Sequence, residues 1–150
     1  MRSGVVIFPG SNCDRDMIVA LRQITGKTPI KIWHKENDFP NLDLIVVPGG
    51  FTFGDYLRCG ALAARSPVIS SIKNHISRGG TVLGVCNGFQ ILIEAKILPG
   101  SLIRNKKLLF TCRETTLEVQ SCIENPFLSG FKIGECLKIP VAHNEGNYFA

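Results

Sequence analysis

The sequence predicts an α/β fold, with a doubly wound, mainly parallel sheet, helices on both faces and a short antiparallel extension. Short apolar runs suited to buried strands alternate with segments of helical periodicity as far as residue 100. Beyond residue 105 the helical segments stop and short alternating strands follow. With 150 residues and 45% hydrophobic content, the chain can bury one compact core, so residues 1–150 are expected to form a single domain.

The first strand and helix are expected within residues 4–26. Apolar, mostly β-branched residues over 4–8 are stopped by Pro9, which is typical of a buried parallel strand. Residues 11–14 supply helix-capping side chains, and the helix that follows ends at Gly26. Four residues at helical spacing form its apolar face: Met17, Ile18, Leu21 and Ile24.

The middle of the chain repeats this alternation. A weaker strand is expected over 30–33, and a strong one over 44–47 stops at the turn 48–50. Ser66 as N-cap and Pro67 at the first helical position begin a second helix, which a glycine pair at 79–80 closes. Its apolar face consists of Val68, Ile69, Ile72 and Ile76.

The last strand–helix pair surrounds a cysteine. Residues 81–85 predict a strand and residues 88–95 a helix, which the turn at 98–100 terminates. The remaining strands are expected at 108–112 and 117–120, where no helical period intervenes, and they form the antiparallel extension.

Composition argues against several classes of function. No apolar run reaches the roughly 18 residues of a membrane span, and the N-terminus does not resemble a signal peptide, so a cytoplasmic protein without membrane contact is expected. The net charge of +5 is spread thinly, and its densest cluster, Arg104 with Lys106 and Lys107, has no interleaved aromatic residues. A solvated turn, and no nucleic-acid partner, is the expectation.

The cysteines do not form a metal or disulfide pattern. None of the six lies in a C-x-x-C pair, and there are only three histidines to complement them. Scattered reduced thiols are expected. The six are Cys13, Cys59, Cys86, Cys112, Cys122 and Cys136.

Cys86 is the candidate nucleophile. It follows an apolar strand, precedes a helix and is flanked by Gly84 and Gly88, which is the arrangement of a nucleophile elbow. The helix N-terminus favours a thiolate, and the backbone N–H of Asn87 lacks a helical partner and can point at an oxyanion. The alternative is that Cys86 is simply a small buried residue of the core. A second glycine pair, at 49–50, ends a neighbouring strand and could supply another amide to the same crevice.

Four segments together resemble the class I glutamine amidotransferases, in particular the glutaminase subunits of phosphoribosylformylglycinamidine synthases. The resemblance implies a flavodoxin-like fold. It also implies that the subunit hydrolyses glutamine and passes ammonia to a large synthetase subunit, with a small bridging subunit between them, in purine biosynthesis. No cofactor is implied here; ATP and Mg are expected on the synthetase subunit. The segments are 9–14 (PGSNCD), 48–60 (PGGFTFGDYLRCG), 83–90 (LGVCNGFQ) and 139–143 (IPVAH).

The same resemblance implies the roles of individual residues. Cys86 attacks the glutamine amide to form a thioester, and the amides of Gly50 and Asn87 hold the oxyanion. Four further residues are implied in substrate binding: Gly49, Phe51, Gln90 and His143. The stretch 54–60, with Asp55, Tyr56 and Arg58, is a candidate subunit contact, although an ordinary structural turn fits it almost as well.

The family completes its triad with a Pro-His-Pro-Glu motif, which these 150 residues do not contain. The resemblance therefore implies that the domain lacks its C-terminal part, with an unpaired sheet edge and an exposed apolar face. His143 and Glu145 have the right spacing but match a different family segment, and His34 and His75 are expected to be a loop residue and a helix-end residue. Since loss of triad members costs roughly six powers of ten in a serine protease, the chain alone should turn over negligibly, while Cys86 should still react with electrophilic glutamine analogues.

Two alternatives stay open at this stage. One is a catalytically incomplete remnant with a binding role only. The other is a cysteine hydrolase or chaperone of the DJ-1/PfpI kind, which the residues disfavour because those proteins pair the cysteine with a glutamate after the first strand and typically with a neighbouring histidine. The segment 9–12 and Asn87 occupy those positions here.

Overall fold

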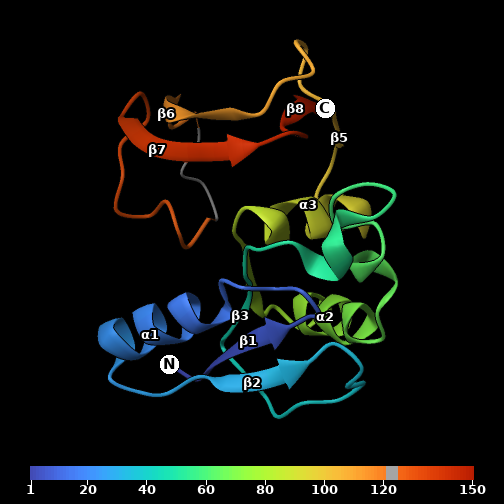
Figure 1. Ribbon diagram of the computed structural model, residues 1–150. Helices are drawn as coiled ribbons and strands as arrows, with labels where there is room; N and C mark the ends of the chain where they lie inside the picture. Colours follow the sequence, from blue (N-terminus) through green and yellow to red (C-terminus); the bar gives the residue numbers. More distant parts are fainter. Residues whose placement is uncertain (121–124) are drawn as a thin grey trace. The chain divides into compact units, whose positions relative to one another are not determined.

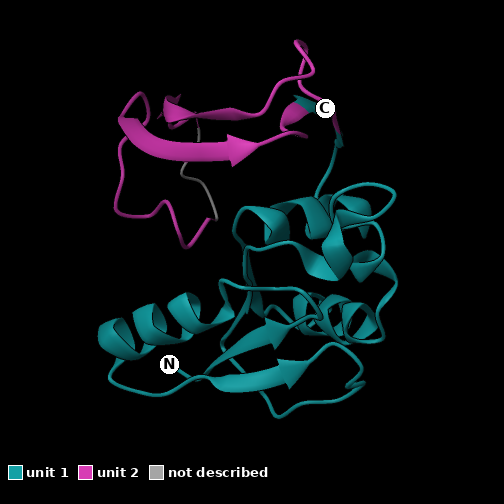
Figure 2. Cartoon of the chain, in the orientation of Figure 1, with its two compact units in different colours: residues 1–102, 148–150 teal, residues 103–147 magenta. Residues whose placement is uncertain are grey.

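The computed structural model describes residues 1–120 and 125–150, so that Cys122 lies outside the described residues. These divide into two compact units (Figure 2): unit 1 contains Met1–Leu102 and Tyr148–Ala150, and unit 2 contains Ile103–Asn147. Two compact units can belong to one domain or to two. The expected single domain over residues 1–150 therefore stays a prediction.

Unit 1 is built on a four-stranded parallel sheet in the order β2-β1-β3-β4 (Figure 1). In register, Val5 of β1 lies opposite Lys31 of β2 and Val46 of β3, and all three strand pairs are parallel. The expected strands are confirmed within one residue at each end. Their bounds are β1 Ser3–Ile7, β2 Ile30–Trp33, β3 Leu44–Val47 and β4 Thr81–Gly84.

Helices cover both faces of this sheet, as predicted. Because successive strand residues point to opposite faces, Val5 and Val46 pack with Leu21 of α1 (Asp14–Thr25) on one face. Alternate residues of the same strands form a larger cluster on the other face with α2 (Val68–Ser77) and α3 (Asn87–Glu94). The members of the larger cluster are Val6, Phe8, Ile32, Ile45, Val47, Ala63, Val68, Ile69, Ile72, Ile91, Leu92 and Ala95.

The strand order creates a switch point between β1 and β3. From this central pair the chain leads outward to β2 on one side and to β4 on the other. The loops after β1, β3 and β4 therefore gather at the same carboxyl edge of the sheet, where open α/β folds place their ligands. Two backbone hydrogen bonds hold them there: Phe53 N–H to Pro9 O at 2.7 Å and Val85 N–H to Val47 O at 3.0 Å.

The helix caps differ from the sequence prediction. Neither α1 nor α2 has a side-chain cap, because Cys13 occupies the N-cap of α1 and Pro67 that of α2. The hydroxyl of Ser66 instead bonds to the ring of His34. The apolar face of α1 is also shorter than predicted, since Ile24 in its last turn is 83% exposed. Gly26 does close α1 in the left-handed conformation that the prediction assigned to it.

Unit 2 contains an antiparallel pair, β6 (Thr111–Glu118) and β7 (Cys136–His143), which confirms the predicted extension. The two short strands predicted at 108–112 and 117–120 are wrong in their bounds, because one strand covers most of this region and residues 108–110 are exposed. Two shorter strands, β5 (Ser101–Ile103) and β8 (Asn147–Phe149), pair with each other.

Among the described residues, no helix is both long enough and apolar enough to cross a membrane. The five cysteines in these ranges are free thiols. At the edge of the sheet in unit 1, β4 is only half buried, and Val85 directly after it is 38% exposed.

Candidate nucleophile site

Cys86 occupies a strained turn between β4 and α3. Its backbone angles are φ 54° and ψ −114°, a region that residues with a side chain rarely adopt. Such strain persists only where the surrounding structure enforces it, and it is typical of functional residues. The thiol is exposed at the N-terminus of α3. The turn therefore has the form of a nucleophile elbow, as the sequence predicts.

The two glycines of the elbow are required by space. A Cβ on Gly88 would lie 1.9 Å from the carbonyl oxygen of Val47, and one on Gly84 would lie 2.9 Å from the carbonyl oxygen of Gly88. Both obstacles are backbone atoms, which cannot rotate away. The first turn of α3 is thus pressed directly onto the end of β3, and this contact fixes the direction in which the elbow presents Cys86.

The glycine pair after β3 lies against the nucleophile. A Cβ on Gly49 would be 3.2 Å from the Cβ of Cys86, and Gly50 has a φ of 128° that favours glycine. Asn87 is the first residue of α3, so its amide has no partner within the helix. The structure thus sets Gly49 against Cys86, and the two residues expected to hold the oxyanion, Gly50 and Asn87, follow these directly in the chain. That their amides point at a ligand stays a prediction.

The loop after β1 braces this glycine pair. The hydroxyl of Ser11 donates to the carbonyl oxygen of Gly49 at 3.0 Å, and the N–H of Phe51 donates to the carbonyl oxygen of Gly10 at 3.4 Å. A Cβ on Gly50 would lie only 2.7 Å from the backbone nitrogen of Asn12. The backbone around Gly50 is therefore confined by the loop after β1.

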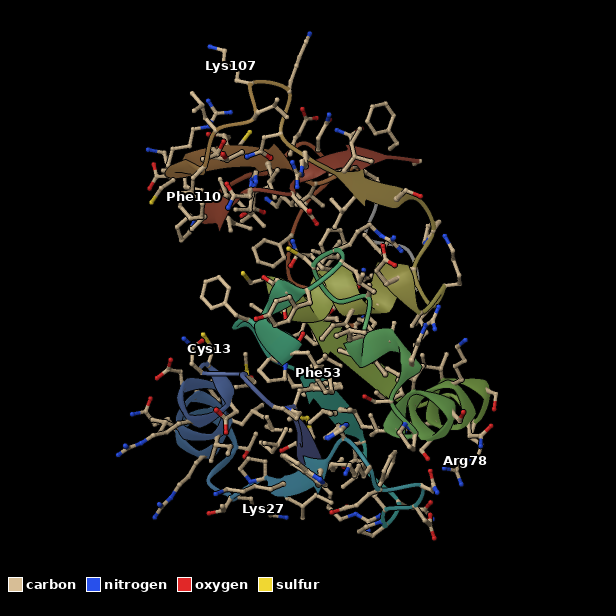
Figure 3. The ribbon with its side chains drawn as sticks, turned by 45° about the vertical axis from the view of Figure 1, so that its right-hand side comes forward. Cys13, Lys27, Phe53, Arg78, Lys107 and Phe110 are labelled. Atoms are coloured by element: carbon tan, nitrogen blue, oxygen red, sulfur yellow. The ribbon has the colours of Figure 1, made fainter. Side chains whose placement is uncertain are left out.

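A second thiol adjoins the site. Cys13 lies at the start of α1 (Figure 3), with its Sγ 3.6 Å from where a Cβ on Gly49 would be. Burial, followed by the negative charges of Asp16, Cys86 and Asp14, raises the pKa of Cys13 above its ordinary value. Cys13 therefore stays a neutral thiol at neutral pH, and it is a poorer nucleophile than a thiolate.

The side chain of Asn87 is a feature that the sequence did not reveal. It is 1% exposed, and its Oδ1 accepts hydrogen bonds from both the N–H (3.2 Å) and the hydroxyl (2.7 Å) of Thr52. Its Nδ2 donates to Oδ1 of Asp55 at 3.0 Å and to Oε1 of Gln90 at 2.9 Å. Nothing in the local sequence pattern signals this pairing, because Thr52 and Asp55 are more than thirty residues away along the chain.

In the stretch 54–60, expected to be either a subunit contact or an ordinary structural turn, two of the three named residues have partners within unit 1. Asp55 is half buried and bonded to Asn87. Arg58 is exposed but forms an ion pair with Glu94 of α3, with Nε donating to Oε1 at 2.9 Å, and this hydrogen bond lowers the pKa of Glu94. Only Tyr56 of the three named residues is both exposed, at 73%, and without a recorded ion pair. The contact role of this segment stays a prediction.

The two histidines of unit 1 have partners other than the Cys86 thiol. His34, expected as a loop residue, follows β2 but is 5% exposed, with its Nδ1 3.1 Å from the hydroxyl of Ser66. His75 is near the end of α2 as predicted, and its Nε2 is 3.1 Å from the carbonyl oxygen of Thr81. Within residues 1–120 and 125–150, no hydrogen bond to the Cys86 thiol is recorded, and no group of side chains there could hold a metal ion.

His143, expected in substrate binding, belongs to unit 2. Its Nδ1 is 3.0 Å from Oδ1 of Asn105, and a Cβ on Gly146 would collide with its ring at 2.2 Å. Asn105 also donates to the carbonyl oxygen of His143 at 2.8 Å. His143 is thus held in a defined orientation within its own unit. The other implied substrate residues, Gly49, Phe51 and Gln90, all lie in unit 1 with Cys86.

Comparison with known proteins places this arrangement in a family. Residues 1–150 match the CobB/CobQ-like glutamine amidotransferase domain. The chain is 56% identical over 150 residues to the phosphoribosylformylglycinamidine synthase subunit PurQ of Rhizobium johnstonii, covering 100% of this chain and 67% of that protein. It is 52% identical over 151 residues to the PurQ subunit of Bradyrhizobium diazoefficiens, covering 100% of this chain and 64% of that protein.

A solved structure is similar as well. The structure of PurLQS from Thermotoga maritima contains a chain that superposes with a TM-score of 0.89 at 42% identity, over 99% of this chain and 68% of that one. The chain described here therefore spans about two thirds of the length of the relatives it matches.

Proposed function

Because this chain belongs to the family of CobB/CobQ-like glutamine amidotransferase domains, we propose that it is the glutaminase component of a phosphoribosylformylglycinamidine synthase, acting through Cys86. One observation carries the assignment of the site: the strained elbow holds an exposed thiol against the glycine backbone that follows β3. The relatives support this function and give no support to a hydrolase or chaperone of the DJ-1/PfpI kind.

The reaction begins when the Cys86 thiolate attacks the side-chain amide carbon of glutamine. The carbonyl oxygen gains a negative charge, for which the backbone N–H groups of Gly50 and Asn87 are the proposed donors. Collapse of this intermediate breaks the carbon–nitrogen bond, and the nitrogen leaves as ammonia after taking up a proton. Water then cleaves the thioester, which gives glutamate and restores the thiol.

The rest of the substrate is proposed to contact the residues around the thiol. Gln90 lies one helical turn after the elbow, and Phe51 follows the glycine pair with 59% of its side chain exposed. An exposed aromatic ring beside a nucleophile can cover the aliphatic part of glutamine. His143 is a further proposed binding residue. No hydrogen bond joins a side chain in the described ranges to the Cys86 thiol, so the uptake of its proton is assigned to no residue here.

Ammonia is consumed by a partner. The large synthetase subunit and the small bridging subunit are the proposed partners, in agreement with the PurLQS structure that the chain resembles. ATP and Mg are proposed to act on the synthetase subunit, since amide hydrolysis by a thiol needs neither. A cytoplasmic location is proposed, because the described cysteines are free thiols.

The test is covalent labelling with a chloroketone analogue of glutamine, in which a thiolate displaces chloride and forms a carbon–sulfur bond. We expect labelling at Cys86, protection by glutamine, and loss of labelling in Cys86→Ala, as measured by peptide mass spectrometry. Cys112→Ala is the matched control, because Cys112 is also a free, exposed cysteine and belongs to unit 2. Labelling that glutamine does not reduce, or that falls on Cys112 as readily as on Cys86, contradicts the proposal.

A further inference from the structure

The amide side chain of Asn87 joins three parts of the nucleophile site. It follows Cys86 directly, bonds to Thr52 and Asp55 in the loop after β3, and bonds to Gln90 on α3. From this geometry we infer that Asn87 is a positioning residue for glutamine hydrolysis, whose side chain sets the loop and Gln90 relative to the nucleophile. The inference rests on the proposed function and concerns a role separate from that of the backbone amide.

The hydrogen-bonding groups around the Asn87 side chain match a carboxamide, which has one acceptor end and one donor end. Both groups that face Oδ1 are donors, the N–H and hydroxyl of Thr52, and both groups that face Nδ2 are acceptor oxygens, from Asp55 and Gln90. Asn87 is 1% exposed and Thr52 is 2% exposed, so water cannot replace a lost partner easily. A buried polar group left without its hydrogen bond is destabilising, because it has lost its contact with water and gains nothing in return. A carboxylate at this position would turn two acceptors toward each other.

The loop that Asn87 holds is strained. Phe53, Gly54 and Asp55 have successive positive φ values of 53°, 69° and 54°. For residues with side chains, such conformations are strained and persist only when the surroundings enforce them. The hydrogen bonds of Asn87 reach Thr52 before this turn and Asp55 at its end. One side chain thus spans the strained turn.

This turn controls the position of the oxyanion backbone. Thr52 lies two residues after Gly50, and its own N–H is held by Asn87 at 3.2 Å. Loss of the Thr52–Asn87 hydrogen bonds therefore releases the segment 50–52 from α3. The hydrogen bonds from this region to the loop after β1 remain. The expected consequence is a shift of the Gly50 amide relative to Cys86.

Gln90 is oriented by the same side chain. Because Asn87 and Gln90 are three residues apart on α3, they lie on one helix face. The bond from Nδ2 of Asn87 to Oε1 of Gln90 at 2.9 Å fixes which end of the Gln90 amide is turned toward Asn87. All four hydrogen bonds of the Asn87 side chain go to protein groups, so its effect is exerted through Gly50 and Gln90.

The experiment compares two electrophiles in the full-length protein. Asn87→Leu keeps the size of the side chain and removes all four hydrogen bonds. We expect the maximal rate of inactivation by the chloroketone glutamine analogue to fall about 10- to 100-fold, since small misplacements at an active site carry losses of this size. The rate of Cys86 alkylation by iodoacetamide, which needs only an accessible thiol, is expected to stay close to that of the unaltered protein.

A polarity exchange provides the rescue. Asn87→Asp alone faces Asp55 with a like charge and should lose at least as much rate as Asn87→Leu. The double variant Asn87→Asp with Asp55→Asn restores a donor opposite an acceptor, and Gln90 can turn its own amide to match. The share of the rate that was lost through the loop 52–55 should return in the double variant, while the share lost through the orientation of Gln90 should not. Absence of rescue, or an equal loss with iodoacetamide, overturns the positioning role.

Thr52 supplies the independent pair of variants in case Asn87 variants do not fold. Thr52→Val removes the hydroxyl donor at nearly constant shape, and Thr52→Ser keeps it. We expect Val to lower the maximal inactivation rate by the glutamine analogue and Ser to preserve it; equal rates overturn the inference. Failure of the proposed function has a different signature, because then glutamine does not protect even the unaltered protein from labelling.

Discussion

Strand β3 of unit 1 and strand β6 of unit 2 differ in how they are stabilised. All four residues of β3 are buried, whereas β6, with eight residues, contains none that is buried. β3 is covered by helices on both faces, while β6 is held by its ladder to β7. A fully packed interior deforms little, so the packing around β3 can maintain the strained turn at Cys86.

Each unit nevertheless contains a buried asparagine that organises a loop. Asn87 joins the elbow to the segment 52–55, and Asn105 in unit 2 joins His143 and Gly146. Asn105 is 8% exposed and has five side-chain hydrogen bonds to protein groups. The two units thus differ in apolar packing but use the same polar device to fix their loops.

The largest difference between the units should come from glycine substitution. In Gly88→Ala the new Cβ meets the carbonyl oxygen of Val47 at 1.9 Å, and neither backbone can yield without separating α3 from β3. We expect a loss of more than about 5 kcal/mol in unfolding free energy, which most domains cannot sustain. The matched control is Gly130→Ala in unit 2, where nothing lies within 4 Å.

Thermal unfolding followed by circular dichroism measures both variants. Gly130→Ala is expected to unfold at nearly the same temperature as the unaltered protein, and Gly88→Ala to give little soluble folded protein. A folded Gly88→Ala with an ordinary melting temperature would show that the packing of α3 on β3 is not the constraint that fixes the elbow.

The second prediction concerns large apolar side chains. Ile45 on β3 is 0% exposed, and Ile45→Ala should lower the unfolding free energy by about 2–5 kcal/mol through lost burial and a residual cavity. Leu117 on β6 is 49% exposed, and Leu117→Ala should change it by less than about 0.5 kcal/mol. Urea unfolding measures the two. If Leu117→Ala lowers the unfolding free energy as much as Ile45→Ala does, Leu117 is buried in solution and not exposed.

Hydrophobic pattern was sufficient to predict the strands and helices of unit 1. Runs such as 44–47 are apolar at every position, which only a strand covered on both faces requires, and the observed bounds of β3 match. Cys86 could be singled out because its glycines and the following helix carry a recognisable spacing. In unit 2 the pattern was weaker, since β7 contains Pro140 and none of its residues is buried.

The polar contacts could not be predicted in the same way. Side-chain hydrogen bonds join residues far apart in the sequence, such as Asn87 with Thr52 and Asn105 with His143. Ser66 illustrates the difficulty, because a serine before a proline indicates a helix cap, yet its hydroxyl bonds to His34 from a distant loop. The local sequence pattern predicts a hydrogen bond to a neighbouring backbone group for such residues. The actual partner, when it is distant in the sequence, is seen only in the folded structure.

The smallest effect should be a pH dependence that originates in unit 1. His34 is 5% exposed, and its Nε2 is the one buried side-chain nitrogen or oxygen without a partner in the described part of the chain. Its ring lies among aromatic rings, within 5.3 Å of that of Phe53 between centroids. Burial, and then the positive charge of Lys35, lowers the pKa of His34 below its ordinary value of 6.5.

The sign follows from proton binding. As the pH falls through 6.5, the unfolded chain takes up a proton at His34 while the folded chain resists it, so the unfolding free energy should decrease and level off below the folded pKa. Above this range the group contributes no pH dependence. Urea unfolding of the unaltered protein and His34→Phe across this interval measures the effect. We expect Phe to flatten the dependence, and Lys35→Gln to reduce it slightly. If the unfolding free energy of His34→Phe depends on pH as steeply as that of the unaltered protein, the proton is taken up by another group. The buried His34 ring would then not be the source of a pH dependence in unit 1.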